Sequence, residues 1–109
     1  MTLRLAEAVR DLLEADRRER LAQILEEAHS ADVARTLREL PVEQQTTVLR
    51  LLSREQAGAV LHEMDDQTLW ELARALDEVE LSGILERMPA DNAAQVVDEL
   101  PEEQAEKVL

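Results

Sequence analysis

The side chains of this sequence that occur in patterns suited to chemistry are carboxylates. They gather at four places: Glu26 and Glu27 before His29 and Asp32, the pair Asp65 and Asp66, Asp91, and the run Asp98, Glu99, Glu102 and Glu103. Hard divalent cations prefer such oxygen ligands, and Mg²⁺ keeps several waters, so one or two carboxylates can suffice for an ion. A carboxylate at a helix start is also an ordinary capping residue, favourable by about 0.3–1 kcal/mol. Each group is therefore open to both interpretations.

Residues for catalysis are in short supply. The chain has no Cys, and its two His are His29 and His62. Nucleophilic catalysis needs a Ser, Cys or Lys beside a base. The Ser residues of this chain are expected to be helix caps or small packing residues, as with Ser53 and Ser82. No glycine-rich phosphate loop and no His/Glu pair with helical zinc spacing occurs. We predict a protein that is not an enzyme, with no catalytic and no cofactor-binding residues.

The charge balance restricts the partners. Asp and Glu total 25 against 12 Lys and Arg, a formal net charge of −13. Such a field repels phosphate backbones and anionic lipid, so we expect no nucleic acid and no direct membrane contact, whereas cations or basic proteins are favoured. The charge could also serve only to keep a small domain in solution. No apolar run approaches the ~18 residues that span a bilayer, and we expect a cytoplasmic location.

The elements that position these carboxylates are predicted to be helices. The sequence has no Phe or Tyr and a single Trp, Trp70, so its core must be built from Leu, Val, Ile, Ala and Met. Two Gly and three Pro interrupt a chain of 109 residues. This composition is typical of one domain of nearly continuous helix with short connections.

Apolar positions recur every 24 residues and define the predicted fold. Within each unit they are spaced three or four apart, which marks one face of a helix. The equivalent sets are Val33, Ala57 and Leu81; Ala34, Gly58 and Ser82; Leu37, Leu61 and Leu85; Leu40, Met64 and Met88; Val48, Leu72 and Val96; Leu49, Ala73 and Val97; and Leu52, Leu76 and Leu100. Val9, Leu13, Ile24, Leu25 and Ala28 form a weaker earlier copy, and Ala105 and Leu109 begin a later one. We predict an all-α, right-handed superhelical α-solenoid of short helical hairpins, with a 24-residue repeat and about 8–9 helices.

Local signals predict where these helices begin. Ser53 with Gln56 and Asp77 with Glu80 have the spacing of capping boxes. Pro41, Pro89 and Asp65 occupy equivalent positions, where the second helix of each hairpin should open, with proline in the first turn.

Other single residues have specific predicted places. The small residues Ala34, Gly58 and Ser82 should mark a close helix crossing. His62 should point sideways into solvent, and His29 should lie between hairpins. Trp70 either covers an edge of the core or forms an exposed anchor for a partner.

Two strings carry a resemblance that periodicity does not supply, AHSADVARTLRELPVEQQTTVLRLLSREQAGAVLHEM and ILERMPADNAAQVVDELPEEQAEKVL. From about Leu21 to Leu109 the chain resembles the cytoplasmic N-terminal domain of MgtE-type magnesium transporters and channels. The matching positions are Ala28, His29 and Asp32; Leu40, Pro41 and Glu43; and Asp91, Asn92 and Ala94.

The resemblance implies a function and partners. Residues 1–109 would be one helical-repeat domain, a fragment of a longer transporter in the inner (plasma) membrane that acts as a homodimer. The domain would lie in the cytoplasm and regulate the pore through Mg²⁺ ions that bridge it to CBS domains. These CBS domains would be followed by the transmembrane domain.

The same resemblance names Asp91 as a metal ligand, with Asp98 as a further candidate, and Mg²⁺ as the ion. Asn92 and Gln95 stand where the family often has carboxylates, so sensing here would be weaker or moved to residues such as Asp98. The alternative is a free-standing α-solenoid that binds a basic protein.

Overall fold

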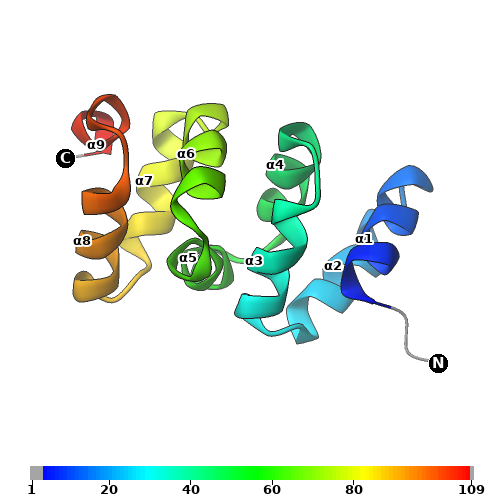
Figure 1. The fold of residues 1–109 in the computed structure, drawn as a ribbon. Helices are drawn as coiled ribbons and strands as arrows, with labels where there is room; N and C mark the ends of the chain where they lie inside the picture. The colour runs from blue at the N-terminus through cyan, green and yellow to red at the C-terminus, as the bar shows by residue number, and fades with distance from the viewer. Residues whose placement is uncertain (1–3, 109) are drawn as a thin grey trace.

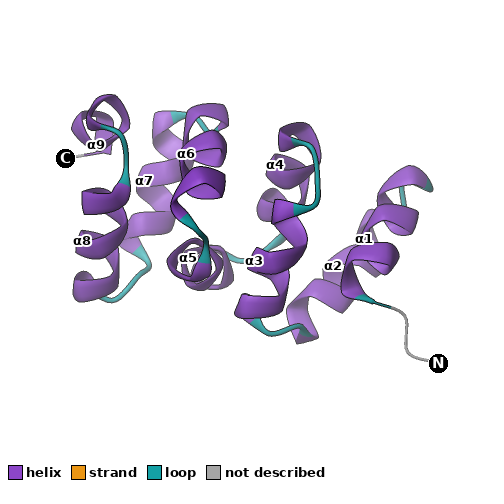
Figure 2. Ribbon diagram, viewed as in Figure 1, coloured by secondary structure: helices purple, strands orange, loops and turns teal. Residues whose placement is uncertain are grey.

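The computed structural model describes residues 4–108, which form nine α-helices joined by short turns (Figures 1 and 2). The all-α class and the number of helices are confirmed for this range, and Leu109 lies outside it. The helices are α1 (Leu5–Glu14), α2 (Arg18–Glu27), α3 (Ser30–Arg38), α4 (Val42–Leu51), α5 (Arg54–Glu63), α6 (Asp66–Ala75), α7 (Glu78–Glu86), α8 (Ala90–Glu99) and α9 (Glu102–Val108).

The helices pair into hairpins that stack in a row. The odd-numbered helices α1, α3, α5, α7 and α9 each pack on the next, and α4 packs on α6. The row measures 43 × 23 × 21 Å, and its two ends carry the two termini (Figure 1). Helices of about ten residues are marginal alone in water, so this stacking supplies their stability.

The helix starts follow the predicted signals. Ser53 and Asp77 form complete capping boxes with Gln56 and Glu80. Asp65 caps α6 by accepting a hydrogen bond from the Thr68 amide. The proline prediction was wrong by one residue, because Pro41 and Pro89 are the N-caps of α4 and α8. Their extended ψ angles, 154° and 142°, place them just outside the first turn, and their carbonyls still accept the first helical hydrogen bonds.

The core runs along the whole row and uses the repeated apolar positions. Val48, Leu72 and Val96 are at most 1% exposed, and so are Leu37 and Leu61. The first hairpin joins the same core through Val9, Leu21 and Leu25. The 24-residue pattern therefore predicted the buried face of each unit.

Gly58 lies at a close crossing. A Cβ atom built on Gly58 would be 2.5 Å from Cγ of Met88, in the turn that leads into α8. The absence of a side chain therefore lets α5 approach the following hairpin. The equivalent Ala34 is buried, whereas Ser82 is only half-buried.

Candidate functional site

The two predicted metal ligands, Asp91 and Asp98, lie on α8 and are both exposed. They are seven residues apart, so they project from nearly the same side of the helix about 10 Å from one another along its axis. Among residues 4–108, neither carboxylate has an ion-pair partner. The helix thus presents two separate carboxylates to solvent, and they are too far apart to share one ion.

The neighbouring amide, Gln95, is engaged by the protein. Its Oε1 lies 3.1 Å from His62 Nε2, so the Nε2–H tautomer donates to it. The prediction that His62 points into solvent was wrong, because its side chain is half-buried and reaches across to α8. α5 and α8 pack on one another, and the His62–Gln95 hydrogen bond lies between them. Asn92 is half-buried on the same helix.

Asp65 and Asp32 have structural roles. Asp65 accepts hydrogen bonds from the Thr68 hydroxyl at 2.6 Å and the Thr68 amide, and lies 3.6 Å from Arg38. The bond from the Thr68 hydroxyl is the main cause that lowers the pKa of Asp65. Asp32 pairs with Arg35 one helical turn away. The capping interpretation is therefore confirmed for Asp65, whereas Asp32 forms an ion pair that was not predicted from the sequence.

The described residues do not bring a complete metal site together. Within residues 4–108, no three His, Asp or Glu side chains are grouped so that they could hold an ion. Mg²⁺ accepts one or two carboxylates and fills its other positions with water or with groups from elsewhere. Asp91 and Asp98 fit that requirement, because each is solvent-accessible and neither is paired within the chain described.

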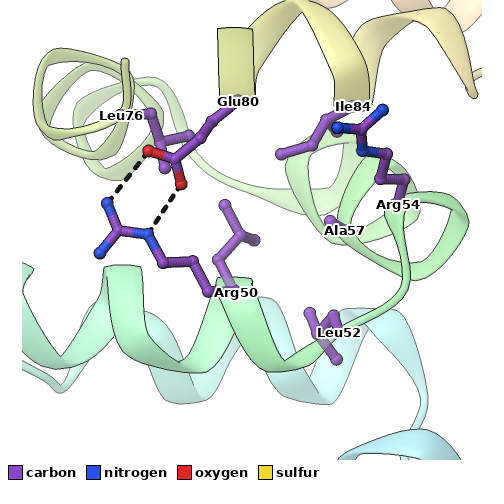
Figure 3. A pocket seen from close by; sticks show the side chains of 8 residues that line it. Arg50, Leu52, Arg54, Ala57, Leu76, Glu80 and Ile84 are labelled. Atoms are coloured by element: carbon purple, nitrogen blue, oxygen red, sulfur yellow. Dashed lines mark hydrogen bonds and ion pairs between the residues drawn. The ribbon is translucent and has the colours of Figure 1, made fainter.

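A groove of about 240 Å³ lies where the α4–α5 and α6–α7 turns meet (Figure 3). Across it, Arg50 donates to both carboxylate oxygens of Glu80, with Nε–Oε2 and Nη2–Oε1 distances of 2.7 and 3.1 Å. Arg54 lies over Gly83, where a Cβ would be 2.7 Å from the Arg54 Cζ. The remaining lining is apolar, and includes Leu52, Ala57, Leu76 and Ile84. The Arg50–Glu80 ion pair therefore connects α4 to α7 across this groove.

The Arg50–Glu80 pair predicts a specific pH dependence. The hydrogen bond from Arg50 lowers the pKa of Glu80 from 4.5 to about 2. The pair's contribution is therefore complete above pH 4.5 and is lost as the pH falls from 4.5 toward about 2. Because Glu80 is 27% and Arg50 54% exposed, we discount this contribution for solvent screening to about 1 kcal/mol.

We expect the Glu80→Gln variant to lose about 1 kcal/mol less stability than the wild type between about pH 5 and about pH 2.5. Urea unfolding followed by circular dichroism at the two pH values measures this. Glu55→Gln is the matched control, because the Arg87–Glu55 pair is 58% and 61% exposed and should leave the profile unchanged. Parallel profiles for the wild type and Glu80→Gln would contradict the assignment.

Trp70 lies at an edge between two hairpins. It is 40% exposed, and its indole N–H donates to the backbone carbonyl of Glu99 at the end of α8. This hydrogen bond joins α6 to the end of α8, and the exposed part of the ring is compatible with either of its two predicted roles.

Comparison with known protein families assigns most of the chain to one of them. The family model described as the MgtE intracellular N domain matches residues 28–109. The chain belongs to this family. The match begins later than the predicted Leu21, so α1 and α2 lie outside it. The family is one of transporter domains and not of enzymes, and its description places the domain inside the cell.

A solved structure shares the fold of this MgtE N domain. It is the crystal structure of the cytosolic domain of the Mg²⁺ channel MgtE in complex with ATP, with 24% sequence identity and a TM-score of 0.69. The alignment covers 94% of this chain and 48% of that one, so the chain spans about half the length of the domain it matches. The comparison with curated proteins gives no match. No helix in the described part of the chain has the length and apolar character that crossing a bilayer needs.

Proposed function

We propose that this MgtE N domain senses Mg²⁺ for a magnesium transporter or channel and gates its pore. Asp91 and Asp98 would each supply one ligand to a separate ion. The CBS domains of the same protein would complete the coordination of each ion. The observation that carries the proposal is the pair of exposed, unpaired carboxylates on one side of α8, in a member of this family.

The negative charge of this domain explains why Mg²⁺ would favour the packed arrangement. The net charge is −13, and from Met88 onward the chain has six carboxylates, Asp91, Asp98, Glu99, Glu102, Glu103 and Glu106, against the single cation Lys107. Packing this end against another acidic surface is unfavourable unless cations lie between them. Mg²⁺ that binds only the packed arrangement shifts the equilibrium toward it, which links ion concentration to closure.

The proposal includes the other parts of the transporter. Its partners are the CBS domains and the transmembrane domain, in a full-length homodimer, with this domain on the cytoplasmic side of the inner membrane. The domain itself catalyses no reaction and makes no direct contact with lipid or nucleic acid, in keeping with its acidic charge.

Amide NMR of this chain, titrated with MgCl₂ and with NaCl at matched ionic strength, tests the proposed ligands. We expect larger shifts with Mg²⁺ than with Na⁺ at Asp91 and Asp98. The shift at position 91 should fall by about half or more in Asp91→Asn, and the shift at position 98 in Asp98→Asn. Glu71→Gln is the control, since Glu71 is an exposed carboxylate on α6. Equal shifts with Mg²⁺ and Na⁺ at these two residues would contradict a magnesium site in this chain alone, and would restrict binding to the complex with the CBS domains.

A further inference from the structure

The groove between the α4–α5 and α6–α7 turns contains an arginine, Arg54, without a partner in the described part of the chain (Figure 3). Its side chain forms no ion pair and no hydrogen bond there. Two acids in its surroundings pair with other arginines, Glu55 with Arg87 and Glu80 with Arg50. The N–H donors of the Arg54 guanidinium are therefore free to bind a ligand.

Gly83 of α7 defines where this guanidinium lies. A Cβ atom on Gly83 would be 2.7 Å from Cζ of Arg54 and 2.9 and 3.0 Å from its two Nη atoms. The flat guanidinium thus occupies the space that a side chain at this position would take. Gly83 is buried inside a helix, although glycine is a poor helix former. The missing side chain therefore lets the charged group lie directly against α7.

The contact between Arg54 and Gly83 is not part of the 24-residue repeat. One unit earlier, Ser30 and Ala59 stand at the equivalent positions, and one unit later Glu78 stands in place of Arg54. Stacking of the other hairpins therefore does not require a guanidinium on the helix backbone. The arrangement is a feature of this one groove and not of the solenoid fold.

The rest of the groove offers an apolar surface beside the guanidinium. Ala57, Leu76 and Ile84 are 1%, 8% and 6% exposed and form its buried part, and Leu52 is half-buried in its wall. The groove has a volume of about 240 Å³. A protein cavity of about 150 Å³ holds benzene, so this one has room for about ten non-hydrogen atoms.

We propose that this groove binds a small organic monocarboxylate. The carboxylate would lie on Arg54, because a guanidinium matches both oxygens of a carboxylate. The apolar part of the ligand would cover Ala57, Leu76 and Ile84. A ligand with one negative charge fits best, since one guanidinium is free and the net charge of −13 disfavours ligands with more. An apolar pocket with few polar groups is typical of small-molecule sites.

An NMR titration of the ¹⁵N-labelled chain with sodium hexanoate tests the proposal at about pH 7, where a carboxylate is ionised. NaCl at equal ionic strength is the reference. We expect saturable shifts at the Arg54 Nε–H and at the amides of Gly83 and Ile84, with a dissociation constant of about 1 mM. Acetate lacks the apolar chain and hexanol lacks the charge, so each should bind at least about tenfold more weakly.

Variants of the protein separate the guanidinium from its surroundings. Arg54→Gln should weaken hexanoate binding at least about fivefold, and Arg54→Lys should restore only part of it, because an ammonium lacks the planar fork. Gly83→Ala should weaken binding at least about threefold, since its Cβ displaces the guanidinium. Arg74→Gln is the matched control, because Arg74 is exposed, has no ion pair in the described chain and does not line the groove. Spectra without ligand establish that each variant is folded.

Three outcomes would overturn the proposal. Shifts that do not saturate, or that centre outside the groove, would remove the site. Unchanged affinity in Arg54→Gln would show that the carboxylate does not bind this arginine. Equal affinity for acetate and hexanoate would remove the apolar part of the site. The Mg²⁺ titration concerns Asp91 and Asp98, which do not line this groove, so the two experiments fail independently.

Discussion

Replacing Leu72 by Ala should lower the free energy of unfolding by about 3 kcal/mol, within the ~2–5 kcal/mol observed for buried leucines. Leu72 is 0% exposed and lies in the middle of α6, which packs on α4. Its equivalents Val48 and Val96 are 0% and 1% exposed, so the core continues through this point in both directions. The deleted atoms leave a cavity between stacked hairpins that cannot collapse without moving several helices.

Chemical denaturation followed by circular dichroism measures the Leu72→Ala effect. Val79→Ala is the control, because Val79 is 74% exposed and should change stability by less than about 0.5 kcal/mol. Small domains are stable by only ~5–15 kcal/mol, so the expected loss is a large share of the total. A Leu72→Ala variant within about 1 kcal/mol of the wild type would contradict the continuous core.

The second large effect concerns Gly58 and depends on Met88. In the wild type, Gly58→Ala should destabilise by about 1–2 kcal/mol, because its Cβ would lie 2.5 Å from Cγ of Met88 and force that side chain aside. In a Met88→Ala background the obstruction is gone. There, Gly58→Ala should stabilise by about 0.5–1 kcal/mol, because Ala is a better helix former than Gly.

A double-mutant cycle from urea denaturation measures this change of sign. The expected coupling between positions 58 and 88 is about 2 kcal/mol, in the range found for residues in contact. The same sign for Gly58→Ala in both backgrounds would show that the glycine is not required by the crossing.

Most of the fold could be predicted from the sequence because one periodic pattern determines it. The spacing that links Leu37, Leu61 and Leu85 repeats helix by helix, so each unit predicts the next. Caps with side-chain acceptors, such as Ser53 and Asp77, were predicted correctly. Proline has no such acceptor, and its fixed φ suits both the N-cap and the first turn, which explains the one-residue error at Pro41 and Pro89.

Contacts between hairpins were not predicted, because they depend on how helices from different units face each other. The pairs His62–Gln95, Arg50–Glu80 and Trp70 with the Glu99 carbonyl join residues about 30 positions apart. The repeat relates some of these contacts to one another. Gln56 and the carbonyl of Glu26 are 30 residues apart, as are Glu80 and Arg50, and each member of the first pair lies 24 residues before its counterpart in the second. The proposed metal ligands came from the resemblance, since an exposed Asp on a helix has no local signal that separates sensing from solubility.

The most direct test of the proposed function is binding of this chain to the CBS domains of its own transporter, measured by isothermal calorimetry in MgCl₂ and in NaCl of equal ionic strength. We predict that the two bind in Mg²⁺ and that their affinity is at least about tenfold lower in Na⁺. We also predict that Asp91→Asn lowers this affinity in Mg²⁺ but not in Na⁺. Association of equal strength in both salts, or an Asp91→Asn variant that binds as the wild type does, would contradict a magnesium-bridged sensor.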